Sequence, residues 1–208
     1  MITPDFRKKM ADSWFSYLQI QICKEFEYLE NNKVKFSKRD WSKNKKNEGG
    51  GTSFLLSNGK IFDKVGVNKS TVSGIFPKKF RSKILGAEKK GKYWASGVSV
   101  VAHMRNPKMP SIHFNTRFIV TSKEWFGGGM DVTPSHEDLK EKIMIHDELK
   151  KVCVQNKKNY KKYKKWCDKY FYLPHRKEPR GIGGIFLTMK LKIGLKTLNL
   201  LENLVFLL

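Results

Sequence analysis

Cysteine, arginine and long apolar runs are scarce in this sequence of 208 residues. Its three cysteines, Cys23, Cys153 and Cys167, form neither an even disulfide framework nor a CxxC pair. We therefore expect reduced thiols and a cytoplasmic protein. No apolar run is long enough to span a bilayer, and the first residues lack the basic-then-apolar order of a signal peptide. These absences argue against a disulfide scaffold and a membrane-spanning protein.

Arginine accounts for only seven of the 42 basic residues, although the formal net charge is +23. A basic chain suggests nucleic-acid binding, but a coding bias toward A- and T-rich codons gives the same lysine excess without a partner. Nothing in the sequence resembles an RNA-binding aromatic platform, so nucleic acid ranks last among the partners considered. Arginine, which is preferred for bidentate contacts to carboxylates, lies beside the glycine-rich motifs. This placement favours a specific acidic ligand.

Three segments have the apolar spacing of helices. The first begins with Thr3 as a cap and Pro4 at the first helical position. Its apolar stripe consists of Met10, Trp14, Leu18, Ile22, Phe26 and Leu29. The second follows Ser135 and Asp138, which are spaced like a capping box, and the third spans residues 159–173. We expect these helices to cover a sheet.

Residues 96–103 and 112–120 alternate in character around a connection that contains Pro107 and Pro110, which is the pattern of a β-hairpin. Side chains on a strand alternate between its two faces. Each strand therefore has one largely polar face, formed by Ser99, Val101 and His103 on the first and by His113, Asn115 and Arg117 on the second. If these two faces coincide, the sheet presents a polar site.

Two glycine triplets stand out, at residues 49–51 and 127–129. The first lacks both the GxGxxG and the Walker spacing, so alone it predicts a flexible loop, with an anion cradle as the alternative. The second lets the backbone pass close to a ligand or another strand. It leads to Asp131, the sole carboxylate of that stretch. Asp131 either has a chemical role or caps the next turn.

Five segments together resemble oxygen-dependent coproporphyrinogen III oxidase, an enzyme family of haem biosynthesis. They are the triplet at 49–51 with FDKVGVNKSTVSG, then SGVSVVAHMRNPKMPSIHFNTR, WFGGGMDVTP, YKKYKKWCDKYFYLPHR and EPRGIGGIF. They occur in the family's order, and the resemblance runs from the first helix to about Phe186. It implies an α+β fold, with a large antiparallel β-sheet flanked by helices on both faces, and a homodimer.

The resemblance implies oxidative decarboxylation of two propionates of coproporphyrinogen III to vinyls, giving protoporphyrinogen IX. Molecular oxygen is the co-substrate, and no organic cofactor is implied. His113 matches the family's proposed proton donor, and Asp131 matches an acidic residue given a catalytic role. Substrate-contacting positions match Ser99, Asn115, Thr116 and Arg117. The chemistry of the residues agrees: Arg117 suits a propionate, Asp131 suits a base or a stabiliser of positive charge, and His113 suits proton delivery to reduced oxygen.

Four histidines match positions that the family sometimes assigns to a divalent metal: His103, His113, His146 and His175. The residues themselves favour structural or hydrogen-bonding histidines, because four scattered histidines without cysteine or HxH spacing are a weak zinc signature. A divalent metal stays open as the alternative.

After Phe186 the sequence departs from the family pattern, and its leucine-rich end lacks strand alternation. We therefore divide the chain into residues 1–187, the N-terminal two-thirds of the family domain, and 188–208, an off-family tail. A frameshift explains this change, because a one-nucleotide slip converts Phe-Asp-Asp codons into Leu-Thr-Met. The sheet is then incomplete at its C-terminal side, and the region of dimer contact is missing. Three hypotheses follow: the oxidase, an inactive remnant of it, and a basic nucleic-acid-binding protein.

Overall fold

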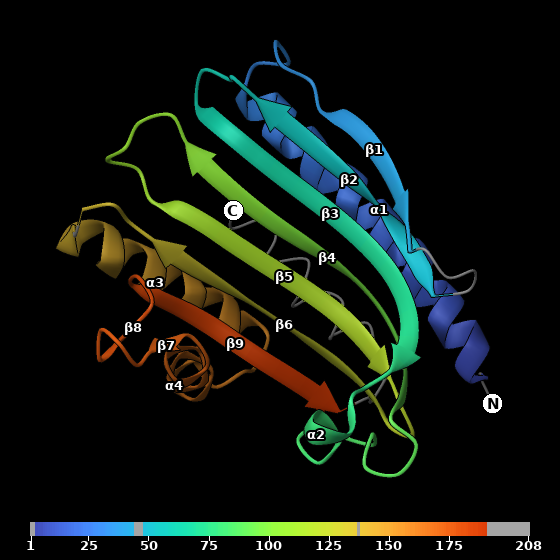
Figure 1. The fold of residues 1–208 in the computed structure, drawn as a ribbon. Helices are drawn as coiled ribbons and strands as arrows, with labels where there is room; N and C mark the ends of the chain where they lie inside the picture. Colours follow the sequence, from blue (N-terminus) through green and yellow to red (C-terminus); the bar gives the residue numbers. More distant parts are fainter. Residues whose placement is uncertain (1–2, 44–47, 137, 191–208) are drawn as a thin grey trace.

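The computed structural model describes residues 3–43, 48–136 and 138–190. It contains a seven-stranded antiparallel sheet of strand order β1-β2-β3-β4-β5-β6-β9, so the predicted α+β class with a large antiparallel sheet is confirmed (Figure 1). The strands are β1 (Ser37–Ser42), β2 (Gly49–Ser57), β3 (Phe62–Ile75), β4 (Lys92–Met104), β5 (Ser111–Val120), β6 (Glu124–Thr133) and β9 (Gly183–Lys190). The first six strands form a meander, and β9 pairs with β6 after an excursion through two helices.

Helix α1 (Pro4–Leu29) lies across one face of the sheet and contacts β3 and β4 (Figure 1). The predicted cap is confirmed, because Thr3 Oγ1 accepts a hydrogen bond from the backbone N–H of Phe6 at 3.3 Å. The predicted stripe is wrong at its two ends, since Met10 and Leu29 are 53% and 45% exposed. The buried side is instead Ala11, Phe15, Leu18, Gln19, Ile22, Cys23 and Phe26.

Every second residue of the central strands packs beneath α1. On β5 these residues include Phe114 and Phe118, which are fully or almost fully buried. Phe118 stacks on Phe126 of β6, with ring centroids 4.6 Å apart, and Phe126 faces Phe15 of α1 at 6.5 Å. The hydrophobic core therefore lies between α1 and this face of the sheet.

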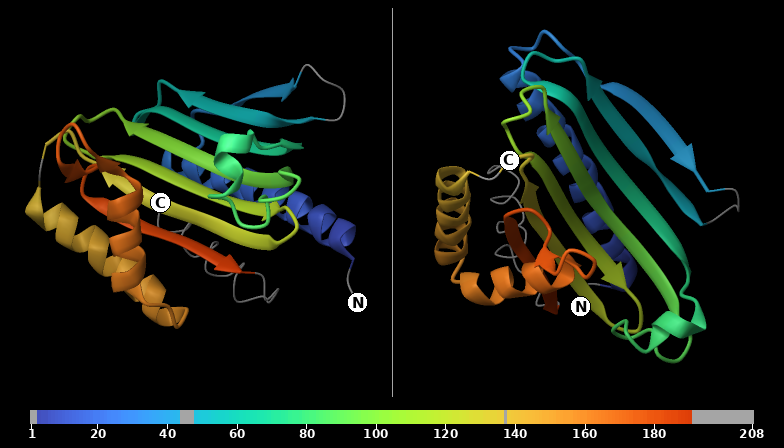
Figure 2. Two further views of the ribbon diagram at one scale, coloured as in Figure 1. Left: turned by 60° about the horizontal axis from the view of Figure 1, so that its bottom comes forward. Right: turned by 60° about the vertical axis from the view of Figure 1, so that its left-hand side comes forward.

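Helices α3 (Leu139–Gln155) and α4 (Tyr160–Tyr170) gather at the β9 end of the sheet (Figures 1 and 2). Asp138 caps α3 by accepting from the N–H groups of Lys140 and Glu141, so the predicted Ser135 cap is wrong. On α4, Tyr170 stacks on Phe186 of β9, with centroids 4.3 Å apart. Phe186 projects from the face opposite α1, so helices contact both faces of the sheet. The short elements are α2 (Lys78–Arg81), β7 (Tyr172–Leu173) and β8 (Glu178–Pro179).

The glycine triplet at residues 49–51 begins strand β2, so its prediction as a flexible loop is wrong. Gly50 and Gly51 pair with β1 on one side and with β3 on the other. The indole of Trp41 lies against Gly51, because a Cβ added at Gly51 would be 3.0 Å from Trp41 Cε2. The Lys69 carbonyl oxygen of β3 would lie even closer to that Cβ. Glycine is therefore needed here for the close approach of the neighbouring strand and of the aromatic ring, not for flexibility.

The three cysteines are all free and buried. Burial raises the pKa of the Cys23 and Cys167 thiols to about 12 and that of Cys153 to about 11. Such thiols stay protonated at neutral pH and are poor nucleophiles. Among the described residues, no helix has both the length and the apolar composition that crossing a bilayer requires.

The predicted division after residue 187 falls inside β9, whose backbone pairs with β6 as far as Lys190. The remaining part of the predicted tail, residues 191–208, lies outside the described residues. The division into two segments stays a prediction.

Candidate active site

Strand register brings the predicted site residues onto one face. In an antiparallel sheet, directly paired residues project to the same side. Three cross-strand rows result: Gly97–Arg117–Gly127, Ser99–Asn115–Gly129 and Val101–His113–Asp131. The predicted coincidence of the two polar strand faces is confirmed. We call this side, which lies opposite α1, the open face.

A hollow of about 390 Å³ lies on the open face. Its lining includes four of the predicted residues, Ser99, Asn115, Thr116 and Arg117. It also includes Trp41, Asn68 and Ser70 of β1 and β3, which the sequence analysis did not select. Asn68 and Ser70 continue the rows, since they pair with Ser99 and Gly97. The alternation of polar residues in the segment KVGVNKST predicts that Asn68 and Ser70 share one face of a strand. Only the register shows that this strand, β3, lies next to β4.

Asp131 is the most buried charged residue of the rows, with 2% of its surface exposed. Its Oδ1 accepts from His113 Nδ1 at 3.0 Å and from Arg180 Nη2 at 2.8 Å. Its Oδ2 accepts from Arg180 Nε at 3.0 Å and from Nη2 at 2.7 Å. Both carboxylate oxygens are therefore engaged, and a bidentate arginine compensates the buried charge. This geometry favours orientation of His113 over the role of a free base that the sequence suggested for Asp131.

Arg180 is a site residue that the sequence analysis missed. It lies 49 residues after Asp131 in the chain, just beyond β8. Its guanidinium carbon is 4.0 Å from the centroid of the Phe171 ring, within the range of a cation–π contact. Arg180 lies in the motif EPRGIGGIF, which the sequence analysis singled out. Nothing in the sequence, however, indicates that this arginine pairs with Asp131.

Arg117 lies at the edge of the hollow beside β9. Its Nη1 donates to Asn115 Oδ1 at 3.1 Å, and its guanidinium carbon is 5.5 Å from the Phe186 ring centroid. A neighbouring amide and an aromatic face therefore hold the guanidinium. Among the described residues, no carboxylate forms an ion pair with Arg117. Its charge is available to an anionic ligand.

Thr116 lies between Asn115 and Arg117 in the sequence, but its side chain projects to the other face. It is 1% exposed, and its Oγ1 is the buried side-chain polar atom without a hydrogen-bond partner in the described part of the chain. Strand alternation places its hydroxyl beneath the sheet, on the α1 side. Thr116 nevertheless belongs to the residues that line the hollow, so its contact with a substrate stays a prediction.

The four histidines considered for a metal do not converge. His103 Nδ1 is 3.0 Å from Ser111 Oγ, and His175 lies exposed in a turn. On α3, His146 Nε2 donates to the Ile182 carbonyl at 2.8 Å, and its Nδ1 accepts from Tyr160 at 2.8 Å. Burial lowers the pKa of His146, which favours the neutral ring.

His113, the fourth of these histidines, is held by Asp131. The described residues contain no group of three or more His, Cys, Asp or Glu that is arranged to hold a metal. The predicted metal set therefore does not fit this structure, and no step below uses a metal.

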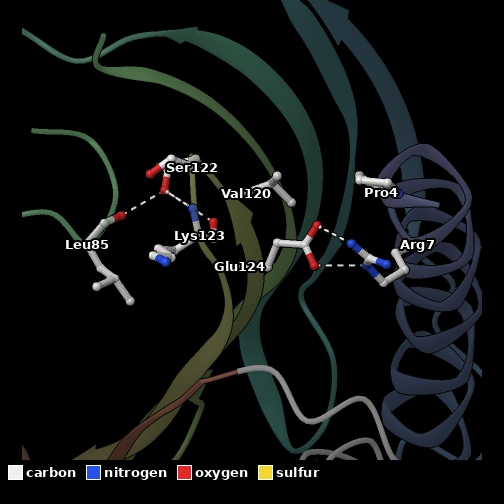
Figure 3. Close-up of a pocket in the computed structure, with 8 residues that line it drawn as sticks. Pro4, Arg7, Leu85, Val120, Ser122, Lys123 and Glu124 are labelled. Carbon is white, nitrogen blue, oxygen red and sulfur yellow. Dashed lines mark hydrogen bonds and ion pairs between the residues drawn. The ribbon is translucent and has the colours of Figure 1, made fainter. Parts of the chain in front are cut away.

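A second hollow, of about 600 Å³, lies where the N-terminus of α1 meets the β5–β6 turn (Figure 3). The ion pair of Arg7 with Glu124, at 2.8 Å, crosses it. Leu85 and Ser122 border its other side. It contains none of the predicted site residues, and its paired charges fasten α1 to the sheet.

The sequence matches the family model described as coproporphyrinogen III oxidase over residues 10–204. That match covers nearly the whole chain and includes all three rows. The chain belongs to the coproporphyrinogen III oxidase family. The predicted family is thereby confirmed.

Similar curated proteins bear the name oxygen-dependent coproporphyrinogen-III oxidase. Those of Rickettsia rickettsii (strain Sheila Smith) and Rickettsia akari are each 47% identical to this chain over 188 residues, and that of Rickettsia bellii (strain RML369-C) is 46% identical. Each alignment covers 86% of this chain and 66% of the relative. The chain thus spans slightly less than two thirds of the length of these family members.

Proposed function

We propose that this chain catalyses the oxygen-dependent oxidative decarboxylation of two propionates of coproporphyrinogen III, which gives protoporphyrinogen IX in haem biosynthesis. The observation that carries this proposal is the cross-strand register. It places Ser99, Asn115, Arg117, His113 and Asp131 on one open face beside a hollow. Relatives that carry the name of this enzyme support the choice of substrate and oxidant.

The substrate carries four carboxylates, and Arg117 can bind one of them. Lys69 also lines the hollow but is paired with Asp12, whereas Arg117 has no carboxylate partner among the described residues. Two unit charges 4 Å apart in a partly screened site interact by about 4 kcal/mol. Asn115 holds the guanidinium at 3.1 Å, so less side-chain freedom is lost on binding. Ser99 and Asn115 add hydrogen-bonding groups along the same row. Arg117 thereby orients a propionate for reaction.

Each propionate loses its carboxylate as CO₂ together with the equivalent of a hydride from the methylene attached to the pyrrole ring, which leaves a vinyl group. Molecular oxygen accepts the two electrons, and protons are needed to complete its reduction. The imidazolium form of His113 supplies such a proton from Nε2, because its Nδ1–H is bound to Asp131. Asp131 orients the imidazole and stabilises its protonated form, as a buried carboxylate does for a catalytic histidine.

Three further features stay predictions. The reaction uses oxygen with no organic cofactor, the enzyme works in the cytoplasm, and the family's homodimer forms only if the region present here suffices for the contact. Three free cysteines are consistent with a reducing compartment. Light scattering of the purified chain measures its oligomeric state.

An oxygen-uptake assay tests the proposed function. The full chain is incubated with freshly reduced coproporphyrinogen III, oxygen consumption is recorded, and vinyl products are quantified by chromatography. We expect uptake coupled to vinyl formation, with at least a 100-fold loss in His113→Ala. His136→Ala is the matched control, because His136 is exposed and belongs to no row. If the wild-type chain produces no more vinyl than a protein-free control, the inactive remnant is the correct hypothesis.

A further inference from the structure

We propose that Arg180 is a positioning residue of the open face: it fixes the carboxylate of Asp131 and, through that carboxylate, the ring of His113. This inference rests on the proposed function. Arg180 does not belong to the three rows, since it comes from the turn after β8 and reaches the sheet from the side of α4. Its role is therefore to hold the residues of a row in place.

The contact between Arg180 and Asp131 occupies the whole carboxylate. Nε and Nη2 of Arg180 engage both oxygens of Asp131 at 2.7 to 3.0 Å, while Asp131 is only 2% exposed. A buried carboxylate without such a partner is costly, and it either gains a proton or moves toward water. Arg180 thus determines the direction of the Asp131 carboxylate.

Arg180 is itself anchored by its surroundings. Its backbone N–H donates to the Phe171 carbonyl at 3.0 Å, and the Phe171 ring lies 4.0 Å from its guanidinium carbon. On the other side, Ile182 N–H donates to the Val132 carbonyl at 3.0 Å, next to Asp131 on β6. Gly181, at φ +57°, makes the turn between them. Two elements therefore hold Arg180 before any ligand binds.

The fixed carboxylate of Asp131 in turn orients the ring of His113. Its Nδ1 bonds to the carboxylate that Arg180 fixes, and its ring lies edge-on to Phe171, with centroids 6.4 Å apart. Within the described residues, Nε2 of His113 has no hydrogen-bond partner. A carboxylate fixed at Nδ1 selects the Nδ1–H tautomer and aims Nε2 away from β6. Arg180 therefore positions the nitrogen that faces a ligand.

Steady-state kinetics of Arg180→Met and Arg180→Lys test this role. We expect kcat to fall about 100-fold in Arg180→Met, since small misplacements of reacting groups have effects of that size. We expect KM to stay within about threefold, because Arg180 is committed to Asp131. Arg180→Lys keeps the charge but loses the bidentate contact, so we expect an intermediate kcat. Arg176→Met is the control, because this exposed arginine in the same turn pairs with Glu178 at 2.5 Å and not with Asp131.

Nitrogen-15 NMR of His113 gives a second readout that does not depend on turnover. We expect the Nδ1–H tautomer in the wild-type protein and in Arg176→Met, and a mixture of tautomers in Arg180→Met. An unchanged tautomer together with an unchanged kcat would overturn the proposal. A raised KM with normal kcat would also overturn it, since Arg180 would then bind the substrate directly.

The two readouts separate this inference from the proposed function. If the wild-type chain lacks turnover, the proposed function fails and the NMR comparison alone decides the role of Arg180. If Arg180→Met does not fold, Arg180→Lys provides both measurements, and a wild-type tautomer with a wild-type kcat in that variant counts against positioning.

Discussion

The same strands present two very different faces. Beneath α1, side chains such as Phe15, Phe114 and Phe118 are completely or almost completely buried. On the open face, neighbouring positions of these strands carry glycine, serine, asparagine, histidine and arginine beside a hollow. Because successive side chains of a strand point to opposite faces, one residue packs in the core and the next faces the hollow. Stability and ligand binding are therefore separable by face.

Polar groups occur on both faces, but their partners differ. Under the sheet, Asp12 of α1 bonds to Lys69, Thr71 and Ser96 of the strands above it. Gln19 Nε2 donates to the carbonyls of Thr52 and Val67, at 2.8 and 3.0 Å. These contacts fasten helix to sheet. On the open face, Asn115 and Arg117 bond to each other and remain accessible at the hollow.

The largest expected effect comes from the covered face. Phe15→Ala removes a side chain with no exposed surface, which packs toward Phe126. We expect the free energy of unfolding to fall by about 4 kcal/mol, the usual cost of such a cavity. Denaturant unfolding followed by circular dichroism measures it. A loss below about 1 kcal/mol would show that the core is not held between α1 and the sheet.

The converse substitution is Arg117→Met on the open face. We expect the affinity for coproporphyrin III, a stable tetracarboxylate probe, to fall about 100-fold, or about 2.7 kcal/mol. The free energy of unfolding should change by less than about 0.5 kcal/mol, because Arg117 has no buried ion pair to lose. Fluorescence titration measures binding, and Arg176→Met again serves as the control. Equal binding by the wild type and Arg117→Met would remove Arg117 from the proposed site.

Glu30, at the C-terminal end of α1, gives a pH-dependent test of the covered side. Its carboxylate accepts from the backbone N–H groups of Lys60, Ile61 and Phe62 at 2.7 to 2.8 Å. Burial acts to raise its pKa, but these three donors outweigh burial and lower the pKa. A lowered folded-state pKa stabilises the protein above the unfolded-state pKa, about 4.3, and this contribution is lost as pH falls through the folded value.

We therefore expect Glu30→Gln to lower the free energy of unfolding by about 2 kcal/mol at pH 7. The difference from wild type should shrink as the pH falls below about 4. Urea titrations at a series of pH values measure this. A difference that stays constant across the series would mean that the charge of Glu30 contributes nothing.

The smallest effect is expected at Thr116, whose side chain lies on the α1 side although its neighbours Asn115 and Arg117 face the hollow. Thr116→Val replaces a buried hydroxyl that lacks a hydrogen-bond partner among the described residues with a methyl group of similar shape. We expect stability to stay equal or to rise by up to about 1 kcal/mol, since no hydrogen bond is lost. Binding and turnover should not change, because the side chain lies under the sheet. A loss of turnover in this variant would restore Thr116 to the site.

Much of the central site was predictable because it lies on adjacent strands. Alternation alone grouped His113, Asn115 and Arg117, and the hairpin pairing added Ser99. The same rule, applied to Thr116, excludes it from that face. Asp131 joins the group because β6 follows β5 directly and pairs with it. Local periodicity and a short connection were sufficient for these residues.

What escaped prediction depends on contacts between distant segments. Arg180 reaches Asp131 across 49 residues, through a turn whose path no periodicity encodes. Trp41 lines the hollow although three strands separate β1 from β5. The sequence pattern does not give this strand order, so the position of Trp41 could not be predicted. The triplet at 49–51 was mistaken for a loop because glycine marks both flexible loops and close strand contacts.

The register of β4 against β5 determines where insertions are tolerated. A single residue added within β5 shifts each later side chain to the opposite face, so Phe114 would point toward the hollow and His113 into the core. The connection between these strands, residues 105–110, can lengthen without that inversion. Insertions and deletions therefore preserve the site only when they fall in the turns that connect the strands. Within the strands, substitutions preserve the register, whereas a change in length does not.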